Sequence, residues 1–215
     1  MAIRTVSDTH LRRHPERARY DRESVYAILD EGYHCHLGFV ANGRPFVIPT
    51  IHARLGDVLY IHGSSASRLI RTLAEGIECC VTVTLLDGLV LARSAFNHSM
   101  NYRSAMVLGH ATLVTDPEEK ETAFRAVVEH VAHGRWDDIR WPTRKEDKAT
   151  AILRLPIEEF SGKVRAGPPK DDPSDLELDA WAGVLPLRIV PGQPVDSPDL
   201  RPGLEPPAYV KEYRR

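Results

Sequence analysis

The stretch His34–Thr50, HCHLGFVANGRPFVIPT, predicts a β-hairpin. Strand-forming runs flank Asn42-Gly43, a dipeptide that readily adopts the positive φ angles of a two-residue hairpin turn. Pro49 cannot donate a ladder hydrogen bond, so the second run is expected at a sheet edge or bent there. Such an edge offers backbone groups to a ligand, although a proline that only protects the edge explains the same pattern. The residues concerned are Val47, Ile48, Pro49 and Thr50.

Further strand-like runs follow the hairpin, with short turn signals between them. The run 45–55 is expected to turn at Gly56-Asp57, and the runs 78–86 and 89–97 are expected to meet at a turn at Asp87-Gly88. One or two closing strands are expected within 151–167. Short connections favour antiparallel pairing. The predicted fold class is therefore mainly β, an antiparallel barrel or sandwich with peripheral helices.

Two peripheral helices are predicted from their end signals. The first is capped by Asp21 and ends at Gly32, with Val25, Ile28 and Leu29 on one face. The second begins with the sequence DPEE, 116–119, which combines a cap, a first-turn proline and two acids, and it is expected to run to about His133. The segment 134–150 is predicted to be a loop.

The chain is expected to divide into three parts. Residues 1–20 are polar and are interpreted as an arm, 21–167 as one β domain, and 168–215 as an extension that packs on the barrel or on a partner subunit. Most of the sixteen prolines lie in this last part, which predicts an extended conformation. Within it, LDAWAGVLPLRI, 178–189, is apolar enough to need a surface to dock on.

The composition excludes several classes of protein. Of the 215 residues, 42% are apolar and 27% charged, and the net charge of −2 provides no overall attraction for nucleic acid or anionic membranes. No apolar run approaches the roughly 20 residues that span a bilayer, and the first residues lack the apolar core of a signal peptide. A cytoplasmic location is expected, with Cys35, Cys79 and Cys80 as reduced thiols.

A small basic corner is predicted in YIHGSSASRLIRTL, 60–73. A strand is expected to end at His62 and a helix to begin near Ser65, where unpaired N–H groups and serine hydroxyls surround a glycine. Arg68 and Arg71 lie one helical turn apart. This combination suits a phosphate, although a plain serine cap with solvated arginines explains it as well. The corner resembles neither a Walker loop nor a dinucleotide fingerprint.

Other candidate residues carry weaker signals. Arg103 and Ser104 lie at a strand start after a loop, and Arg103 could bind a second phosphate oxygen or lie at the surface. His34 and His36 alternate on one strand and share a face. A metal site would need a third ligand, which nothing in the spacing fixes, so none is predicted. No nucleophile or general base is assigned, because the sequence contains no nucleophile elbow or other triad signal.

The order of three motifs resembles the pyridoxamine 5′-phosphate oxidase-like FMN-binding proteins. These motifs are CHLGFV…NGRPFVIPT, then LYIHGSSASRLIR, then NYRSAMVLGHA. The match covers about residues 17–167, with WAGVLPL as a further patch, and is nearest to the branch that contains nitroimidazole-resistance and flavin-nucleotide-binding proteins. The resemblance implies a split β-barrel, a homodimer and FMN at the subunit interface, without nucleic acid or membrane partners.

The resemblance also assigns site residues. FVIPT matches the strand that lines the flavin ring, HGSSASR the phosphate segment, and RSAMVLG a strand with a further phosphate or ring contact. The family's Ser-Arg-Lys is Ser67-Arg68-Leu69 here, so Arg71 or Arg103 would replace the missing cation, and Ser104 stands where glutamine is common. The implied cofactor-binding residues are Val47, Ile48, Pro49, Thr50, His62, Ser64, Ser67, Arg68, Arg71, Arg103, Ser104 and Trp181.

Three functions remain open from the sequence. The first is an FMN-dependent oxidoreductase that takes electrons from a donor such as a reduced nicotinamide and acts on a small organic substrate, with the flavin carrying the electrons. The second is a non-catalytic flavin- or haem-binding protein, since His34, His36 and His62 could serve haem. The third is a structural dimer. Pyridoxamine phosphate oxidation itself is not expected, because the C-terminal segment lacks a matching Arg/His group.

Overall fold

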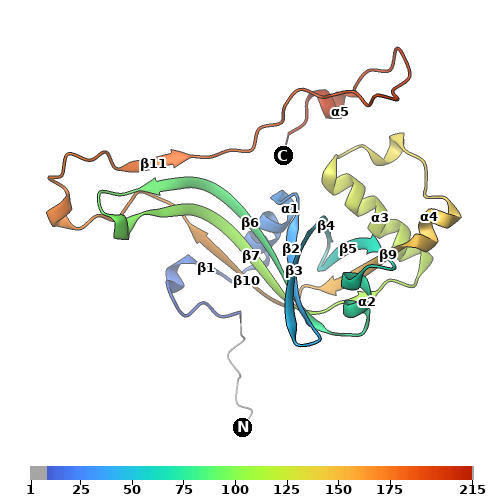
Figure 1. Cartoon of the computed structure of the whole chain (residues 1–215), viewed down its shortest axis with the longest axis horizontal. Helices are drawn as coiled ribbons and strands as arrows, with labels where there is room; N and C mark the ends of the chain where they lie inside the picture. The colour runs from blue at the N-terminus through green and yellow to red at the C-terminus, as the bar shows by residue number, and fades with distance from the viewer. Residues whose placement is uncertain (1–8, 215) are drawn as a thin grey trace, which may run out of the picture.

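The computed structural model describes residues 9–214 and contains two antiparallel sheets around a shared core (Figure 1). The larger sheet has the order β1-β10-β7-β6-β2-β3, with β11 paired to β6, and the smaller has the order β4-β5-β9-β8. This arrangement confirms the mainly β, antiparallel split-barrel class. The strands are β1 (Ala18–Arg19), β2 (Cys35–Ala41), β3 (Arg44–Thr50), β4 (His52–Leu55), β5 (Val58–Ser64), β6 (Glu78–Leu91), β7 (Ser99–His110), β8 (Thr112–Leu113), β9 (Thr150–Pro156), β10 (Glu159–Arg165) and β11 (Gly183–Pro186). The helices are α1 (Arg22–Glu31), α2 (Arg68–Ala74), α3 (Pro117–Val131), α4 (Arg144–Ala149) and α5 (Ala208–Lys211).

Local sequence signals set several of these elements. Asn42 and Gly43 have φ angles of 52° and 71° and join β2 to β3, which confirms the predicted hairpin. Gly56, with φ of 57°, joins β4 to β5. The side chain of Asp21 accepts a first-turn N–H of α1 at 2.8 Å, as a helix cap does. β3 is an edge strand, as Pro49 predicted.

The turn predicted at Asp87-Gly88 is wrong. β6 continues through these residues, with an irregularity in its pairing between Leu86 and Gly88. A Cβ on Gly88 would lie 3.0 Å from the carbonyl oxygen of Leu185 in β11, so the glycine is there to let another strand approach. The chain reverses instead around the 3₁₀ helix Ala95–Asn97, and β7 returns along β6 as a long two-stranded arm (Figure 1).

Two other boundaries differ from the prediction. The run 45–55 is not one strand, because the chain leaves the larger sheet after β3 and enters the smaller one at β4. The segment 134–150 is not all loop, since it contains α4, which starts with a capping box between Thr143 and Glu146. α3 has the predicted cap at Asp116 and ends at Val131, two residues before the expected end.

The core lies between the two sheets and is closed by α1 and α2. α1 contributes Val25, Ile28 and Leu29, the face that the sequence predicted. α2 contributes Leu73, and both sheets contribute fully buried side chains, among which Leu37, Val81, Leu59 and Leu155 are completely inaccessible. Cys35 and Cys79 belong to the same core as free thiols. None of the helices in residues 9–214 is both long and apolar enough to cross a membrane.

The C-terminal segment runs along the arm and then returns toward α3 (Figure 1). β11 pairs with the far half of β6, so residues 183–186 of the apolar stretch 178–189 lie against the sheet, whereas Leu178, Trp181, Leu185 and Ile189 remain half or more exposed. Further on, the Tyr209 hydroxyl donates to Asp138 at 2.6 Å, and the Tyr213 hydroxyl donates to the carbonyl of Val131 at 2.7 Å. These two contacts fasten the end of the chain beside α3.

Candidate functional site

The serine corner is a tight turn between β5 and α2. The strand ends at Ser64, and the helix begins at Arg68, three residues later than predicted, with Ser67 as its cap. The Ser67 hydroxyl oxygen accepts the N–H of Ile70 and the Ser64 hydroxyl oxygen accepts the N–H of Ala66, both at 3.3 Å. The capping interpretation is therefore confirmed for Ser67. Each hydroxyl keeps its own hydrogen, which can still be donated to a ligand.

Gly63 allows α2 to pack closely against the end of β5. A Cβ at this position would lie 3.2 Å from Cγ1 of Ile70 and 3.9 Å from Oγ of Ser67. A larger residue would push the first turn of α2 away from the strand. The glycine therefore fixes where the two serine hydroxyls lie.

Arg68 joins this corner to the edge strand β3. Its guanidinium carbon lies 4.7 Å from the centre of the Phe46 ring, which in turn stacks on Phe39 at 5.6 Å. A cation over an aromatic face is held without losing its hydrogen-bond donors. The contact places Arg68 next to the FVIPT segment, whereas Arg71 lies exposed one turn further along α2.

β3 presents its residues alternately to the core and to the open face of the larger sheet. Ile48 packs against the core, whereas Val47 is 66% exposed and Pro49 is also exposed. No other strand among residues 9–214 pairs with the outer edge of β3, so this edge keeps backbone groups for a ligand. Thr50, at the end of the strand, is half-buried.

His62 lies on β5 just before the serine corner. Its ring is half-buried, and its Nδ1 atom has no hydrogen-bond partner among the described residues. Burial lowers the pKa of His62, so the ring is neutral at pH 7 and can donate from one nitrogen and accept at the other. His62 is therefore a neutral polar group behind the corner and adds no charge to it.

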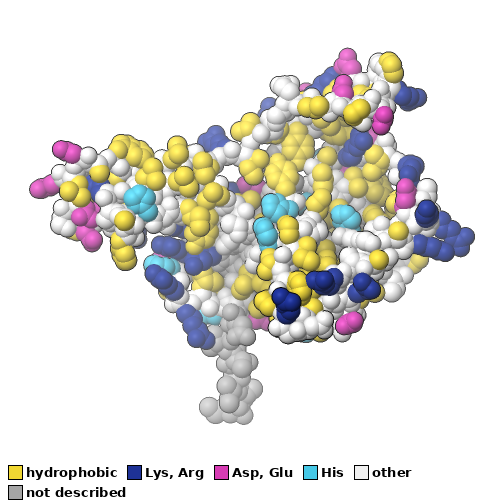
Figure 2. Space-filling model, in the orientation of Figure 1, with side chains coloured by type: hydrophobic (Ala, Val, Ile, Leu, Met, Phe, Trp, Pro, Cys, Tyr) yellow, Lys and Arg dark blue, Asp and Glu magenta, His cyan; other side chains and the backbone are white. Residues whose placement is uncertain are grey.

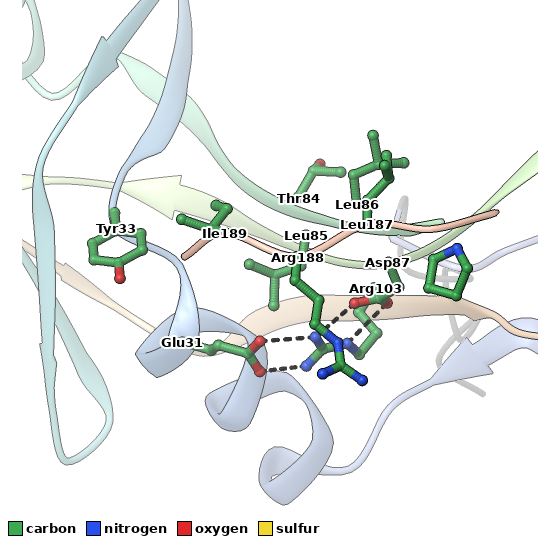
Figure 3. Close-up of a pocket in the computed structure, with 11 residues that line it drawn as sticks. Glu31, Tyr33, Thr84, Leu85, Leu86, Asp87, Arg103, Leu187, Arg188 and Ile189 are labelled. Carbon is green, nitrogen blue, oxygen red and sulfur yellow. Dashed lines mark hydrogen bonds and ion pairs between the residues drawn. The ribbon is translucent and has the colours of Figure 1, made fainter. Parts of the chain in front are cut away.

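Arg103 lies elsewhere in the subunit and is already paired. Its guanidinium donates to both carboxylate oxygens of Asp87, at 3.0 and 2.8 Å, and to both of Glu31, one of them at 2.8 Å (Figure 3). These residues line a pocket of about 840 Å³ between the arm, the end of α1 and the segment after β11. The Ser104 hydroxyl donates to the carbonyl of Lys163 at 3.4 Å.

The predicted residues fall into three groups within one subunit. Positions along β6 measure how far apart the predicted residues lie. Cys79 of β6 pairs with Phe39, which lies beside the corner. Arg103 pairs with β6 six residues further along, and Gly183, next to Trp181, pairs with it twelve residues further along. At about 3.3 Å per residue these offsets are roughly 20 and 40 Å. Trp181, 69% exposed, lies against Gly183. The corner and the Phe46 end of β3 therefore form one group, Arg103 and Ser104 a second, and Trp181 a third, while the Pro49 end of β3 lies within two to three residues, counted along β6, of the second group.

Sequence reasoning missed two residues beside the corner. Arg44 and Phe46 line a pocket of about 670 Å³ together with Arg68. Their position directly after the Asn-Gly turn could have indicated a basic and an aromatic group at the hairpin tip. It also missed the carboxylate partners of Arg103, because Glu31 ends a helix and Asp87 was interpreted as a turn residue.

Many apolar side chains lie exposed on the arm and the segment that covers it (Figure 2). A monomer rarely exposes a large contiguous apolar patch without a partner or ligand for it. The exposed side chains of this surface are Leu86, Leu89, Phe96, Met100, Trp181, Leu185, Ile189 and Val190.

Two sheets around one core, an open edge strand and a serine–arginine corner beside it define a split β-barrel protein. Within that class, the family model for pyridoxamine 5′-phosphate oxidase matches residues 21–164. The chain belongs to this family, as its motifs predicted.

Two solved structures match far more of the chain than the family model does. The flavocytochrome Anf3 from Azotobacter vinelandii is 45% identical, with a TM-score of 0.90 and 97% coverage of each chain. The FAD and heme binding protein from Mycobacterium smegmatis is 36% identical, with a TM-score of 0.87, over 91% of this chain and 96% of that one. A Bacteroides thetaiotaomicron protein named for 5-nitroimidazole antibiotic resistance shares the fold, at 24% identity and a TM-score of 0.58, over 68% of this chain and 86% of that one. No curated protein matches the chain.

Proposed function

We propose that this protein is a flavin-dependent oxidoreductase that binds its flavin between the serine corner and the edge of β3. The observation that carries the proposal is the 45% identity, over 97% of the chain, with a protein named as a flavocytochrome. The geometry supports it, because the corner and β3 are the predicted site residues that lie together.

The corner suits the 5′-phosphate that FMN and FAD share. FMN is the flavin predicted from the motifs, and FAD is named for the mycobacterial relative. Arg68 and Arg71 would supply the positive charge, and the hydroxyls of Ser64 and Ser67 would donate hydrogen bonds to the phosphate oxygens. The open backbone edge of β3 would face the flavin ring.

A homodimer would complete this site. Arg103, Ser104 and Trp181 lie too far along the arm to reach the corner of their own subunit. The exposed apolar surface of the arm favours a second copy as its partner. We therefore propose that the arm of each subunit carries Trp181 toward the flavin site of the other, whereas Arg103 and Ser104, which are hydrogen-bonded within their own subunit, would contact the flavin only if they exchanged those partners for it.

The flavin, when bound, supplies the electron transfer, so the chain needs no nucleophile of its own. The tasks of the residues are to hold the phosphate, to orient the ring against β3 and to limit access of water. A small organic substrate and an electron donor would then meet the exposed side of the ring.

Haem is a second cofactor that specific residues favour. The rings of His34 and His36 lie 5.3 Å apart on the open face of the larger sheet, and both side chains are exposed. Neither ring has a hydrogen bond or ion pair within residues 9–214, so an imidazole nitrogen is available for iron. Both near-full-length relatives have names that include a cytochrome or heme. We propose that one of these two histidines ligates haem iron.

The absorption spectrum of the purified protein tests both cofactors. Two visible flavin bands, with a flavin released by heat and identified by chromatography, would support the flavin site, and a Soret band would support haem. A colourless protein that stays colourless after incubation with FMN, FAD and hemin would refute the proposed function. Loss of the Soret band in His34→Ala or His36→Ala, with flavin retained, would identify the iron ligand.

The phosphate assignment has its own test. Arg68→Ala should weaken flavin binding by about 1.5–3 kcal/mol, roughly 10- to 150-fold, because a charge-assisted hydrogen bond is lost. Titration calorimetry of the cofactor-free protein measures this change. Arg201→Ala, an exposed arginine in the C-terminal segment, is the matched control. Equal affinity in Arg68→Ala and the control would rule out the corner as the phosphate site.

A further inference from the structure

The end of β10 carries a buried arginine that the proposed flavin site does not use. Arg165 is only 8% exposed, although arginine is rarely buried without an anionic partner. Its Nη1 atom donates to the side-chain oxygen of Asn101 and, at 3.5 Å, to the carbonyl of Gly167. Both acceptors are neutral, and no carboxylate of residues 9–214 forms an ion pair with this guanidinium. Arg165 is therefore a buried cation whose charge the described chain does not balance.

One side of this guanidinium is open to a ligand. Its Nε and Nη2 atoms make no hydrogen bond within residues 9–214, and both are accessible to solvent, because the buried polar atoms without a partner lie elsewhere. Asn101 is itself 8% exposed and donates to the carbonyl of Gly167 at 3.1 Å, so it holds Nη1 in place. Two parallel donors of a fixed guanidinium are thus left over, and this pair matches the oxygens of a carboxylate or a phosphate.

Two further donors lie beside Arg165 on the same face of the larger sheet. Tyr102 of β7 lies directly opposite Arg165, and Lys163 lies two residues before it on β10. Both side chains are half-buried. The Tyr102 hydroxyl and the Lys163 ammonium group make no hydrogen bond or ion pair with the chain between residues 9 and 214. Both groups can therefore donate to the same ligand as Arg165.

The N-terminal arm brings another arginine to this place. Arg17 ends the 3₁₀ helix Pro15–Arg17, which contacts β10, and Figure 2 shows several basic side chains around the position that Figure 1 labels β1. Burial and the positive charge of Arg17 lower the pKa of Arg165, whereas Tyr102 raises it. Among residues 9–214, Arg17 forms an ion pair only with Glu16, at 3.7 Å, and the Glu16 side chain is 61% exposed. Cations therefore outnumber acids here, and an anion between the two arginines would remove their repulsion.

We propose that this cluster, the Arg165 site, binds the oxyanion of a small acid, either a carboxylate or a phosphate. Nε and Nη2 of Arg165 bind two oxygens of the anion, and Arg17 contacts it from the arm. The Tyr102 hydroxyl and the Lys163 ammonium group donate to it from the sheet. The anion thereby links the N-terminal arm to β10. The Arg165 site shares no residue with the serine corner or β3, so it does not rest on the proposed flavin site.

Thermal unfolding of the full chain, with the cofactors that it carries on purification, tests the Arg165 site. Inorganic phosphate and succinate at millimolar concentration are the two probes, and sodium chloride of equal ionic strength is the reference. The Tm of wild type should be higher in a probe than in the reference, because an anion that binds only the folded chain stabilises it. Calorimetric titration then gives a Kd for each probe. Tighter binding of phosphate indicates a phosphate ester as the natural ligand, and tighter binding of succinate indicates a carboxylic acid.

Substitutions locate the bound anion. Arg165→Gln and Arg17→Gln should each weaken binding about 10-fold or more, and Tyr102→Phe roughly 2- to 10-fold, because hydrogen bonds from charged groups are stronger than those from neutral ones. If Arg165→Gln does not fold, Arg17→Gln and Tyr102→Phe still test the site, since neither side chain is fully buried. Arg201→Gln, in the exposed C-terminal segment, and Arg68→Gln, in the serine corner, are the controls and should bind the anion as wild type does.

The outcomes separate this site from the flavin site and from a general salt effect. Loss of the Tm rise in Arg17→Gln and Tyr102→Phe, with the rise kept in both controls, supports the Arg165 site. A wild-type Tm that does not exceed the chloride reference overturns the inference, and so does an equal rise in wild type and all variants. A rise that is lost in Arg68→Gln but kept in Arg17→Gln would place the anion in the serine corner and would also overturn it.

Discussion

Replacing Arg103 with glutamine removes the ion pairs that hold the end of α1 to the arm. The guanidinium makes four hydrogen bonds, two to Glu31 and two to Asp87. The Arg103 side chain is 32% exposed, and the carboxylate side chains are 44% and 36% exposed, so water screens part of the attraction. Fully exposed pairs contribute about 0.2–1 kcal/mol and hydrogen bonds to charged groups about 1.5–3 kcal/mol. We therefore expect about 1 kcal/mol per carboxylate.

The loss of both pairs should lower the free energy of unfolding by about 2 kcal/mol. For a chain of this size, that corresponds to a fall in Tm of roughly 4–8 °C. Thermal unfolding followed by circular dichroism, at fixed protein concentration and low salt, measures the change. A double-mutant cycle with Asp87→Asn should give a coupling energy of about 1 kcal/mol with Arg103.

Arg201→Gln provides the control, because that arginine is exposed in the C-terminal segment. If Arg103→Gln melts within 1 °C of this control and the cycle shows no coupling, the ion pairs contribute nothing to stability. Arg103 would then be available to bind a ligand instead of holding α1 to the arm.

Three further perturbations have defined outcomes. Burial raises the pKa of Cys35 to about 12 and the pKa of Cys79 to about 11, so both thiols should resist a thiol reagent at pH 8 until the chain unfolds. The free energy of unfolding should fall above pH 9.0, because these thiols then ionise only in the unfolded chain. Rapid reaction of all three thiols in the folded protein would contradict this prediction. Gly63→Val should lower the free energy of unfolding by about 1–3 kcal/mol and weaken flavin binding, since even a Cβ at this position would lie 3.2 Å from Ile70. Unchanged melting and titration curves would show that α2 can shift freely. The ion pair between Asp171 and Arg93, at 2.9 Å, fastens the start of the C-terminal segment, and Asp171→Asn weakens it. Limited trypsin digestion should therefore cut this segment faster in the variant than in wild type, and equal rates would contradict the anchoring role.

Features set by neighbouring residues could be predicted from the sequence. The Asn42-Gly43 turn, the Asp21 cap and the Ser67 cap each depend on contacts within a few residues. The Asp87-Gly88 turn was wrong because Gly88 serves a strand almost a hundred residues away, and no local pattern announces that pairing. α4 was missed although its Thr143 capping box is a local signal.

The same distinction applies to the candidate site. The corner and β3 come together because the hairpin and the β5–α2 turn are local units joined by the contact between Arg68 and Phe46. The separation of Arg103 and Trp181 from that corner depends on the length of β6, which the mistaken turn concealed. The motif order identified the family, whereas the three-dimensional grouping of its residues required the structure.

β6 pairs along one side with two partners in succession. β2 covers the first part, up to Thr82, and β11 covers the part from Gly88 to Leu91. If the chain were cut after the family-matching region, that second part would become an exposed edge with apolar residues such as Leu89 and Val90. Open apolar edges recruit strands from other chains and cause aggregation. Residues 21–164 expressed alone should therefore aggregate, and the C-terminal segment protects the folded protein from this by covering the edge of β6.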